Sequence, residues 1–108
     1  MKVEKALAKI EKAVAKNKSK AIIKLTQKAD NEVVVKALEA LGKINDEDSR
    51  NFITSYMDNE NESLRIAACK AAIEIGSEYM KTKVRYQISV EQNLEIKRAL
   101  LDALNNAN

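Results

Sequence analysis

The sequence predicts an all-α fold: an α-α superhelix, or solenoid, of about three and a half helix pairs, with seven helices in one domain, residues 1–108. Two features of the composition support this prediction. There is no proline and there are only two glycines, far below ordinary usage, whereas β-hairpins need many such turn residues. Alanine, leucine, lysine and glutamate are abundant, and all are good helix formers. The third observation is an internal repeat of about 31 residues.

The repeat emerges when the chain is compared with itself at successive shifts of 31, 31 and 32 residues. Four apolar positions recur at the spacing i, i+1, i+4, i+7, which is the stripe of an amphipathic helix. They are Ala6, Leu7, Ile10 and Ala13, then Ala37, Leu38, Leu41 and Ile44, then Ala68, Cys69, Ala72 and Ile75, and finally Leu100, Leu101, Leu104 and Ala107. These columns predict the first helix of each pair, at residues 2–16, 32–44, 62–75 and 94–106.

A second set of columns predicts the second helix of each pair. The matching residues at shifts of 31 are Ile22, Ile53 and Val84, and Thr26, Met57 and Ile88. The second helices are expected at residues 19–29, 47–57 and 78–89. The repeats therefore cover residues 2–30, 31–61 and 62–93, with a half repeat at 94–108.

Residues at the joints suit the ends and the starts of helices. Four positions at which helices are expected to stop hold asparagine or glycine, which tolerate the left-handed conformation: Asn17, Asn45, Gly76 and Asn93. Asp46 directly follows Asn45, and Ser77 directly follows Gly76; both are good N-caps for the next helix. The carboxylates of "NDED" therefore predict a helix start. A catalytic pair or a cation site is the alternative, but no converging ligands accompany them.

Two segments carry a family resemblance. "VVVKALEALGKIND", from Val33, and "LRIAACKAAIEIGS", from Leu64, resemble the motif of the HEAT family of α-solenoids in its short bacterial and archaeal form. "IKRALLDALNNA", from Ile96, matches it more weakly. The resemblance covers nearly the whole chain. It implies stacked helix pairs whose second helices line a concave surface, and it implies no particular activity.

The chain departs from the family motif at its charged positions. In the family, an Asp before the first helix of a pair joins the Arg near that helix's start, which predicts the pair Asp58–Arg65 here. Val34 replaces the Arg in the preceding copy, and Ser89 replaces the Asp in the following one. Because this series of charge pairs is incomplete, we expect the apolar packing between repeats to provide most of the stability.

Gly42 falls in the Ala-Leu-Gly column of the motif, inside a predicted helix. A glycine there costs about 1 kcal/mol in helix propensity relative to alanine. We expect its missing side chain to let a neighbouring helix approach closely. Ile73 fills the same column in the next copy, so the close approach is not required in every repeat.

The composition also excludes several kinds of function. The chain has no histidine and one cysteine, Cys69, so it has no internal disulfide, no histidine-based catalysis and essentially no basis for a zinc site. Cys69 shares a column with Leu38 and Leu101, which predicts a buried core residue rather than a reactive thiol. We therefore expect no catalytic residues, no metal and no cofactor in a protein that is not an enzyme. With no bilayer-spanning run and no signal peptide, the predicted location is cytoplasmic.

The predicted function is a protein-binding module or scaffold that holds a partner segment on its concave face. The candidate binding residues all lie on the expected second helices: Lys24, Arg50, Thr54, Tyr56, Lys83 and Tyr86. Because this surface is polar, aromatic and biased to positive charge, the expected partner is an acidic or amphipathic segment of another protein.

Two alternatives stay open. Residues 1–30 hold nine lysines, a pattern that also suits nucleic acid. Arginine is scarce and no aromatic residue accompanies these lysines, so we expect duplex binding to be weak and lost at physiological salt. The other alternative is a structural adaptor or a part of a longer solenoid. Leu94 and Leu101 belong to a broad apolar band on the last helix, which either packs on the preceding pair or makes an end contact, including a weak homodimer.

Overall fold

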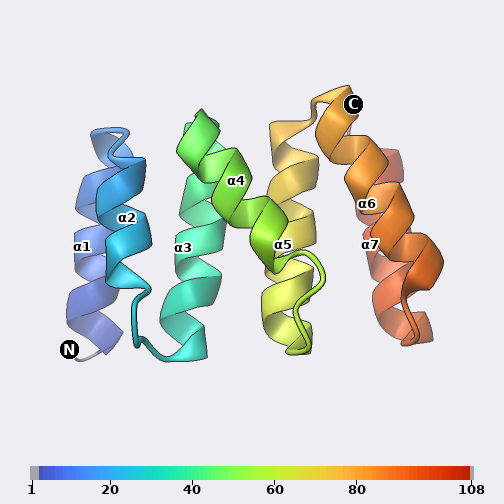
Figure 1. Cartoon of the computed structure of the whole chain (residues 1–108), viewed down its shortest axis with the longest axis horizontal. Coiled ribbons are helices and arrows are strands. Elements are labelled where there is room, and N and C mark those ends of the chain that lie inside the picture. The colour runs from blue at the N-terminus through green and yellow to red at the C-terminus, as the bar shows by residue number, and fades with distance from the viewer. Residues whose placement is uncertain (1–2, 108) are drawn as a thin grey trace.

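Seven α-helices follow one another in stacked pairs in the computed structural model, which describes residues 3–107 (Figure 1). The helices are α1 (Val3–Ala15), α2 (Ser19–Leu25), α3 (Asn31–Ile44), α4 (Glu47–Tyr56), α5 (Glu62–Ile75), α6 (Glu78–Val90) and α7 (Leu94–Asn106). The predicted all-α solenoid of seven helices is confirmed. Lys2, the expected start of the first helix, lies outside the described residues.

The helices form two layers. The first helices of the pairs, α1, α3, α5 and α7, pack side by side, most closely between α3 and α5. The second helices, α2, α4 and α6, lie in front of them in Figure 1. Helix α2 touches α4, but no Cα atom of α4 comes within 8 Å of one in α6. The second layer is therefore open between α4 and α6. The predicted concave shape of this face stays a prediction.

The repeated apolar columns form one continuous core. Leu38, Leu41, Ile53 and Val84 are fully buried, as are Ala37, Ala68, Cys69 and Ala72. Burying the leucine, isoleucine and valine side chains stabilises the fold by about 1.5–3 kcal/mol each, and the alanines contribute less. Residues of these columns are more exposed at the two ends of the stack, because a terminal helix has a neighbour on one side only. Leu7 in the first copy is only half-buried, and Leu101 in the last is 41% exposed.

Most of the predicted caps are present. Asn17, Asn45 and Gly76 all have positive φ, at 55°, 56° and 72°, as expected after the end of a helix. The side chains of Asp46 and Ser77 accept hydrogen bonds from the backbone N–H groups of Ser49 and Met80, which is the N-cap arrangement.

Asn93 differs from its prediction. Its Oδ1 accepts hydrogen bonds from the N–H groups of Glu95 and Ile96, at 2.9 and 3.2 Å, and its φ is −86°. It therefore begins α7 instead of ending α6, because its side chain satisfies backbone donors that the first turn of a helix leaves free.

Helix α2 is shorter than the predicted 19–29 and ends at Leu25. The Thr26 hydroxyl donates to the carbonyl oxygen of Ile23 at 2.6 Å, and threonine is a poor helix former. Two residues later Lys28 has φ 55°, a left-handed conformation that turns the chain away from the helix axis.

Asp46 joins two helix starts, and its loss should therefore be measurable. Its Oδ1 accepts from Ser49 N–H at 2.8 Å, and its Oδ2 accepts from the Ser19 hydroxyl at 2.6 Å. We expect Asp46→Ala to lower the free energy of unfolding by about 1–2 kcal/mol, measured by urea unfolding at pH 7. The matched control is Asp30→Ala, because Asp30 precedes α3 without a side-chain cap bond; its cost should stay within about 0.5 kcal/mol.

The same variant carries a pH signature. The hydrogen bond from Ser19 is the main reason why the pKa of Asp46 lies below its ordinary value of 3.8. Because the ionised carboxylate of Asp46 is favoured in the folded state, it stabilises that state at pH values above the ordinary pKa. This contribution is lost as the pH falls through the lowered pKa. The difference between wild type and Asp46→Ala should shrink in acid. A difference that is constant down to pH 2 would contradict the assignment.

Candidate partner-binding groove

A groove separates α4 from α6 on the face formed by the second helices. It has a volume of about 350 Å³. Its lining comes from α4 and the turn after it on one side and from α6 on the other: Thr54, Met57, Asp58, Thr82, Lys83, Tyr86 and Gln87. Three of the six predicted binding residues, Thr54, Lys83 and Tyr86, thus converge on one groove.

Two residues of the groove lining, the half-buried Lys83 and the exposed Tyr86, belong to a longer stripe on α6. Tyr79, Lys83, Tyr86 and Val90 follow the spacing i, i+4, i+7, i+11, which places them on one face of the helix. Lys83 Nζ lies 5.1 Å from the centre of the Tyr79 ring, within cation–π range. Tyr86 is 63% exposed. The stripe therefore combines aromatic surface with a positive charge.

Large apolar side chains are exposed only at this end of the described chain. The five are Tyr79, Tyr86, Val90, Leu94 and Leu101. Three of them belong to the α6 stripe, and the other two lie on α7. Exposed apolar surface concentrated in one region is typical of an interaction site. The proposed end contact through Leu94 and Leu101 stays a prediction.

The three remaining predicted residues lie outside the groove lining. Arg50 donates from Nη1 to the carbonyl oxygen and Oδ1 of Asn45, at 2.9 and 3.1 Å, so it ties down the end of α3. Tyr56 is half-buried, and its ring centre lies 4.8 Å from that of Phe52. Lys24 lines a different pocket, at the end of α2.

The groove continues toward the start of α5. A second cavity of about 280 Å³ shares Asp58 and Gln87 with it, and its lining also includes Val90, Arg65 and Glu91. Sequence reasoning missed Met57, Thr82, Gln87 and Val90 as lining residues. The i, i+4, i+7, i+11 spacing on α6 was the signal that could have identified Val90.

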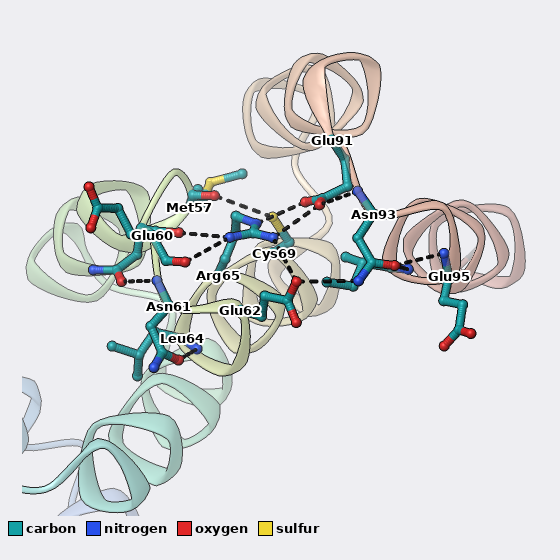
Figure 2. Close-up of polar contacts among 12 residues, drawn as sticks. Met57, Glu60, Asn61, Glu62, Leu64, Arg65, Cys69, Glu91, Asn93 and Glu95 are labelled. Atoms are coloured by element: carbon teal, nitrogen blue, oxygen red, sulfur yellow. Dashed lines mark hydrogen bonds and ion pairs between the residues drawn. The ribbon is translucent and has the colours of Figure 1, made fainter.

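Arg65 closes this end of the groove with a partner other than the predicted Asp58. Its Nε and Nη2 donate to the two carboxylate oxygens of Glu91 at 2.8 and 3.0 Å, and its Nη1 donates to the carbonyl oxygens of Asn59 and Glu60 at 3.0 and 3.2 Å (Figure 2). The prediction of an Asp58–Arg65 pair was wrong. The loop after α6 brings Glu91 to the guanidinium, whereas the turn after α4 presents its carbonyl groups.

Bidentate hydrogen bonding makes this pair strong. The side chains of Arg65 and Glu91 are only 16% and 5% exposed, and their bonds form the bidentate geometry that favours arginine–carboxylate pairs. The hydrogen bond from Arg65 is the main cause of a lowered pKa at Glu91, and the bond to Glu91 is the main cause of a raised pKa at Arg65. Asn93 N–H also donates to Glu91, and Asn93 Nδ2 donates to Glu62. The network therefore holds the α6–α7 loop against α5 through hydrogen bonds.

Cys69 lies fully buried beneath this network, as predicted. Burial is the main cause that raises the pKa of its thiol to about 12, which the nearby Arg65 charge opposes. Thiolate is the reactive form, so Cys69 should be inert in the folded protein.

Thiol modification tests this directly. At pH 8 we expect Cys69 to react with a disulfide reagent at least about 100-fold more slowly in the native protein than in 8 M urea, because reaction requires opening of the structure. A native rate near the denatured rate would contradict a buried thiol.

The described residues contain no cluster of three or more potential metal ligands. Among the helices of residues 3–107, none is both long and apolar enough to cross a membrane. The exposed lysines Lys5, Lys9 and Lys12 of α1, and Lys16 directly after it, do not contribute to the groove. Weak, salt-sensitive duplex binding through them stays a prediction, as does a cytoplasmic location.

Helix pairs stacked in two layers around one continuous core define an α-solenoid. The family model for HEAT repeats matches residues 19–105. The chain therefore belongs to the HEAT-repeat family. No curated protein and no solved structure matches it. HEAT repeats generally mediate protein–protein interaction and are typically non-catalytic.

Proposed function

We propose that this chain is a non-enzymatic interaction module or scaffold that binds a segment of another protein in the groove between α4 and α6. The observation that carries the proposal is the convergence of Thr54, Lys83 and Tyr86 on this groove, in which Lys83 and Tyr86 of the α6 stripe lie on one side. Tyrosine in a cleft is a typical anchor of protein interfaces.

The groove chemistry favours an amphipathic partner segment with acidic residues at one end. Lys83 and the exposed Tyr86 line one side, and the inward-turned hydroxyl of Thr54, which donates to the Arg50 carbonyl oxygen at 2.8 Å, leaves its methyl group for apolar contact. Asp58 lies in both cavities, toward the Arg65 end. An apolar segment with an acidic residue near Lys83 and a basic one near Asp58 would complement both charges.

The test compares capture by variants of the immobilised chain from an extract of the source cell. The double variant Tyr86→Ala/Lys83→Glu removes the aromatic anchor and reverses the charge, so we expect proteins retained by the wild type to be lost. Lys70→Glu is the charge-matched control, because Lys70 is exposed on α5 and does not line the groove.

The outcome that supports the proposal is a protein that binds wild type and Lys70→Glu but not the double variant, and that binds less at higher salt. Equal retention by all three chains would show that the groove is not the site.

A further inference from the structure

A separate pocket lies at the end of α2, apart from the α4–α6 groove and the cavity that continues it. It has a volume of about 430 Å³, which is within the range of small-molecule sites. Its apolar lining is Ala6, Ala21, Leu25, Ala29 and Val33, and its polar lining is Lys24, Gln27, Lys28 and Asp30. It shares no residue with the groove.

The repeat explains why this pocket is open. At the shift of 31 residues, Ala21 corresponds to Phe52 and Leu25 to Tyr56. In the second repeat these two rings contact each other, with centres 4.8 Å apart, and pack half-buried against the core. In the first repeat the alanine is too small to fill the equivalent volume, and Ala21 is exposed. The pocket thus corresponds to the place of an aromatic ring in the neighbouring repeat.

The end of α2 keeps this volume uncovered. The helix stops at Leu25, one turn earlier than the pattern predicts, and the left-handed Lys28 turns the chain aside. The floor of the pocket consists of core residues, because Ala6 and Val33 are each only 3% exposed. An entering apolar group would therefore contact core residues of α1 and α3.

The polar lining favours an anion. Lys24 and Lys28 both line the pocket, and neither forms an ion pair with a carboxylate within residues 3–107. Asp30 is the one acidic residue in the lining. Two lysines against one aspartate leave a net positive charge beside an apolar floor.

We propose that this pocket binds a single-ring aromatic carboxylate. The ring would fill the volume that the Phe52 ring fills in the next repeat, and the carboxylate would pair with Lys24 and Lys28. Such a group occurs both as a free aromatic acid and as the C-terminal phenylalanine of a peptide. The site is independent of the proposed groove, so either proposal can fail alone.

The experiment is a titration of the ¹⁵N-labelled chain with 3-phenylpropanoate, followed by amide chemical shifts. We expect saturable shifts concentrated at residues 21–33. The neutral alcohol 3-phenylpropanol should bind about tenfold more weakly, because it cannot pair with the lysines. Shifts spread over the whole surface, or equal affinity for acid and alcohol, would overturn the proposal.

Two variants separate the ring site from the charge site. Ala21→Phe should fill the pocket as Phe52 does in the next repeat and abolish binding, with the helical circular dichroism unchanged. Lys24→Gln/Lys28→Gln should weaken binding of the acid about tenfold and leave the alcohol unaffected. Lys20→Gln is the control, since Lys20 is exposed on the same helix and does not line the pocket. Unchanged binding to Ala21→Phe would place the ligand elsewhere.

A comparison of ligands then identifies the source of the carboxylate. The peptide Gly-Gly-Phe is titrated as its free acid and as its C-terminal amide. Tighter binding of the peptide acid than of 3-phenylpropanoate would assign the pocket to a chain terminus, and the reverse order would assign it to a free acid. No saturable binding of either acid would reject the site.

Discussion

Arg65→Ala should lower the free energy of unfolding by about 3 kcal/mol, because it leaves an unpaired carboxylate in a buried place. The side chain of Glu91 is only 5% exposed, and the substitution removes both of its bonds to the guanidinium. It also removes the bonds from Arg65 to the Asn59 and Glu60 carbonyl oxygens. In a domain of this size the melting temperature should fall by roughly 12–24 °C. Thermal and urea unfolding measure both quantities.

Arg85→Ala is the matched control. Arg85 and Glu78 lie 4.0 Å apart, and their side chains are 55% and 84% exposed. Solvent screens such a pair, so its loss should cost no more than about 0.5 kcal/mol. The double variant Arg65→Met/Glu91→Leu removes both charges and should be more stable than Arg65→Ala, because no buried charge is then left unpaired. Similar losses for Arg65→Ala and Arg85→Ala would contradict this account.

Acid should reduce the effect of Arg65→Ala. The pKa of Glu91 is lowered from its ordinary value of 4.5, first by the hydrogen bond from Arg65. The pair therefore stabilises the folded protein fully above that ordinary value, and its contribution is lost as the pH falls through the lowered pKa. The difference in unfolding free energy between wild type and variant should narrow over this interval.

The second large effect is expected at Gly42, where α3 meets α5. A Cβ atom on Gly42 would lie 3.1 Å from the Cβ, 3.2 Å from the Cα and 3.3 Å from the carbonyl oxygen of Ala71. Backbone atoms cannot move aside as a flexible side chain can, so valine would force the two helices apart. We expect Gly42→Val to cost about 2–3 kcal/mol in urea unfolding.

Smaller changes at the same helix provide the controls. Glu39→Val places the same β-branched residue on the exposed side of α3. It loses helix propensity and the solvent-exposed ion pair with Lys36, together no more than about 1 kcal/mol. Gly42→Ala should lie between, because a gain of about 1 kcal/mol in helix propensity offsets part of the steric cost. Equal losses for Gly42→Val and Glu39→Val would show that the close approach to Ala71 does not limit stability.

Much of the fold could be predicted from the sequence because a solenoid is built from local patterns. The apolar stripe at i, i+1, i+4, i+7 defines each first helix without reference to distant residues. The shift of 31 residues then places each helix beside its counterpart, and it predicted the close approach of a neighbouring helix at Gly42. The N-caps Asp46 and Ser77 were equally accessible, since a cap bonds to residues three positions away.

The candidate groove was only partly predictable. The sequence placed six candidate residues on the second helices. Of these, Thr54, Lys83 and Tyr86 line the groove, whereas Lys24, Arg50 and Tyr56 do not. Whether a side chain reaches a groove or turns to a carbonyl group or a neighbouring ring depends on contacts that periodicity does not encode. Arg50 reaches Asn45, and Tyr56 packs against Phe52.

By itself the sequence determined the class of the protein: the seven helices, their pairing, the continuous aliphatic core and the place of Gly42. These follow from the 3.6-residue period and from a repeat length that recurs along the chain. Only the tertiary structure decided that Arg65 pairs with Glu91 across 26 residues, that a groove opens between α4 and α6, and that Ala21 leaves a pocket beside two lysines. The physical reason is that such features depend on the distances between helices, which packing of the whole stack sets.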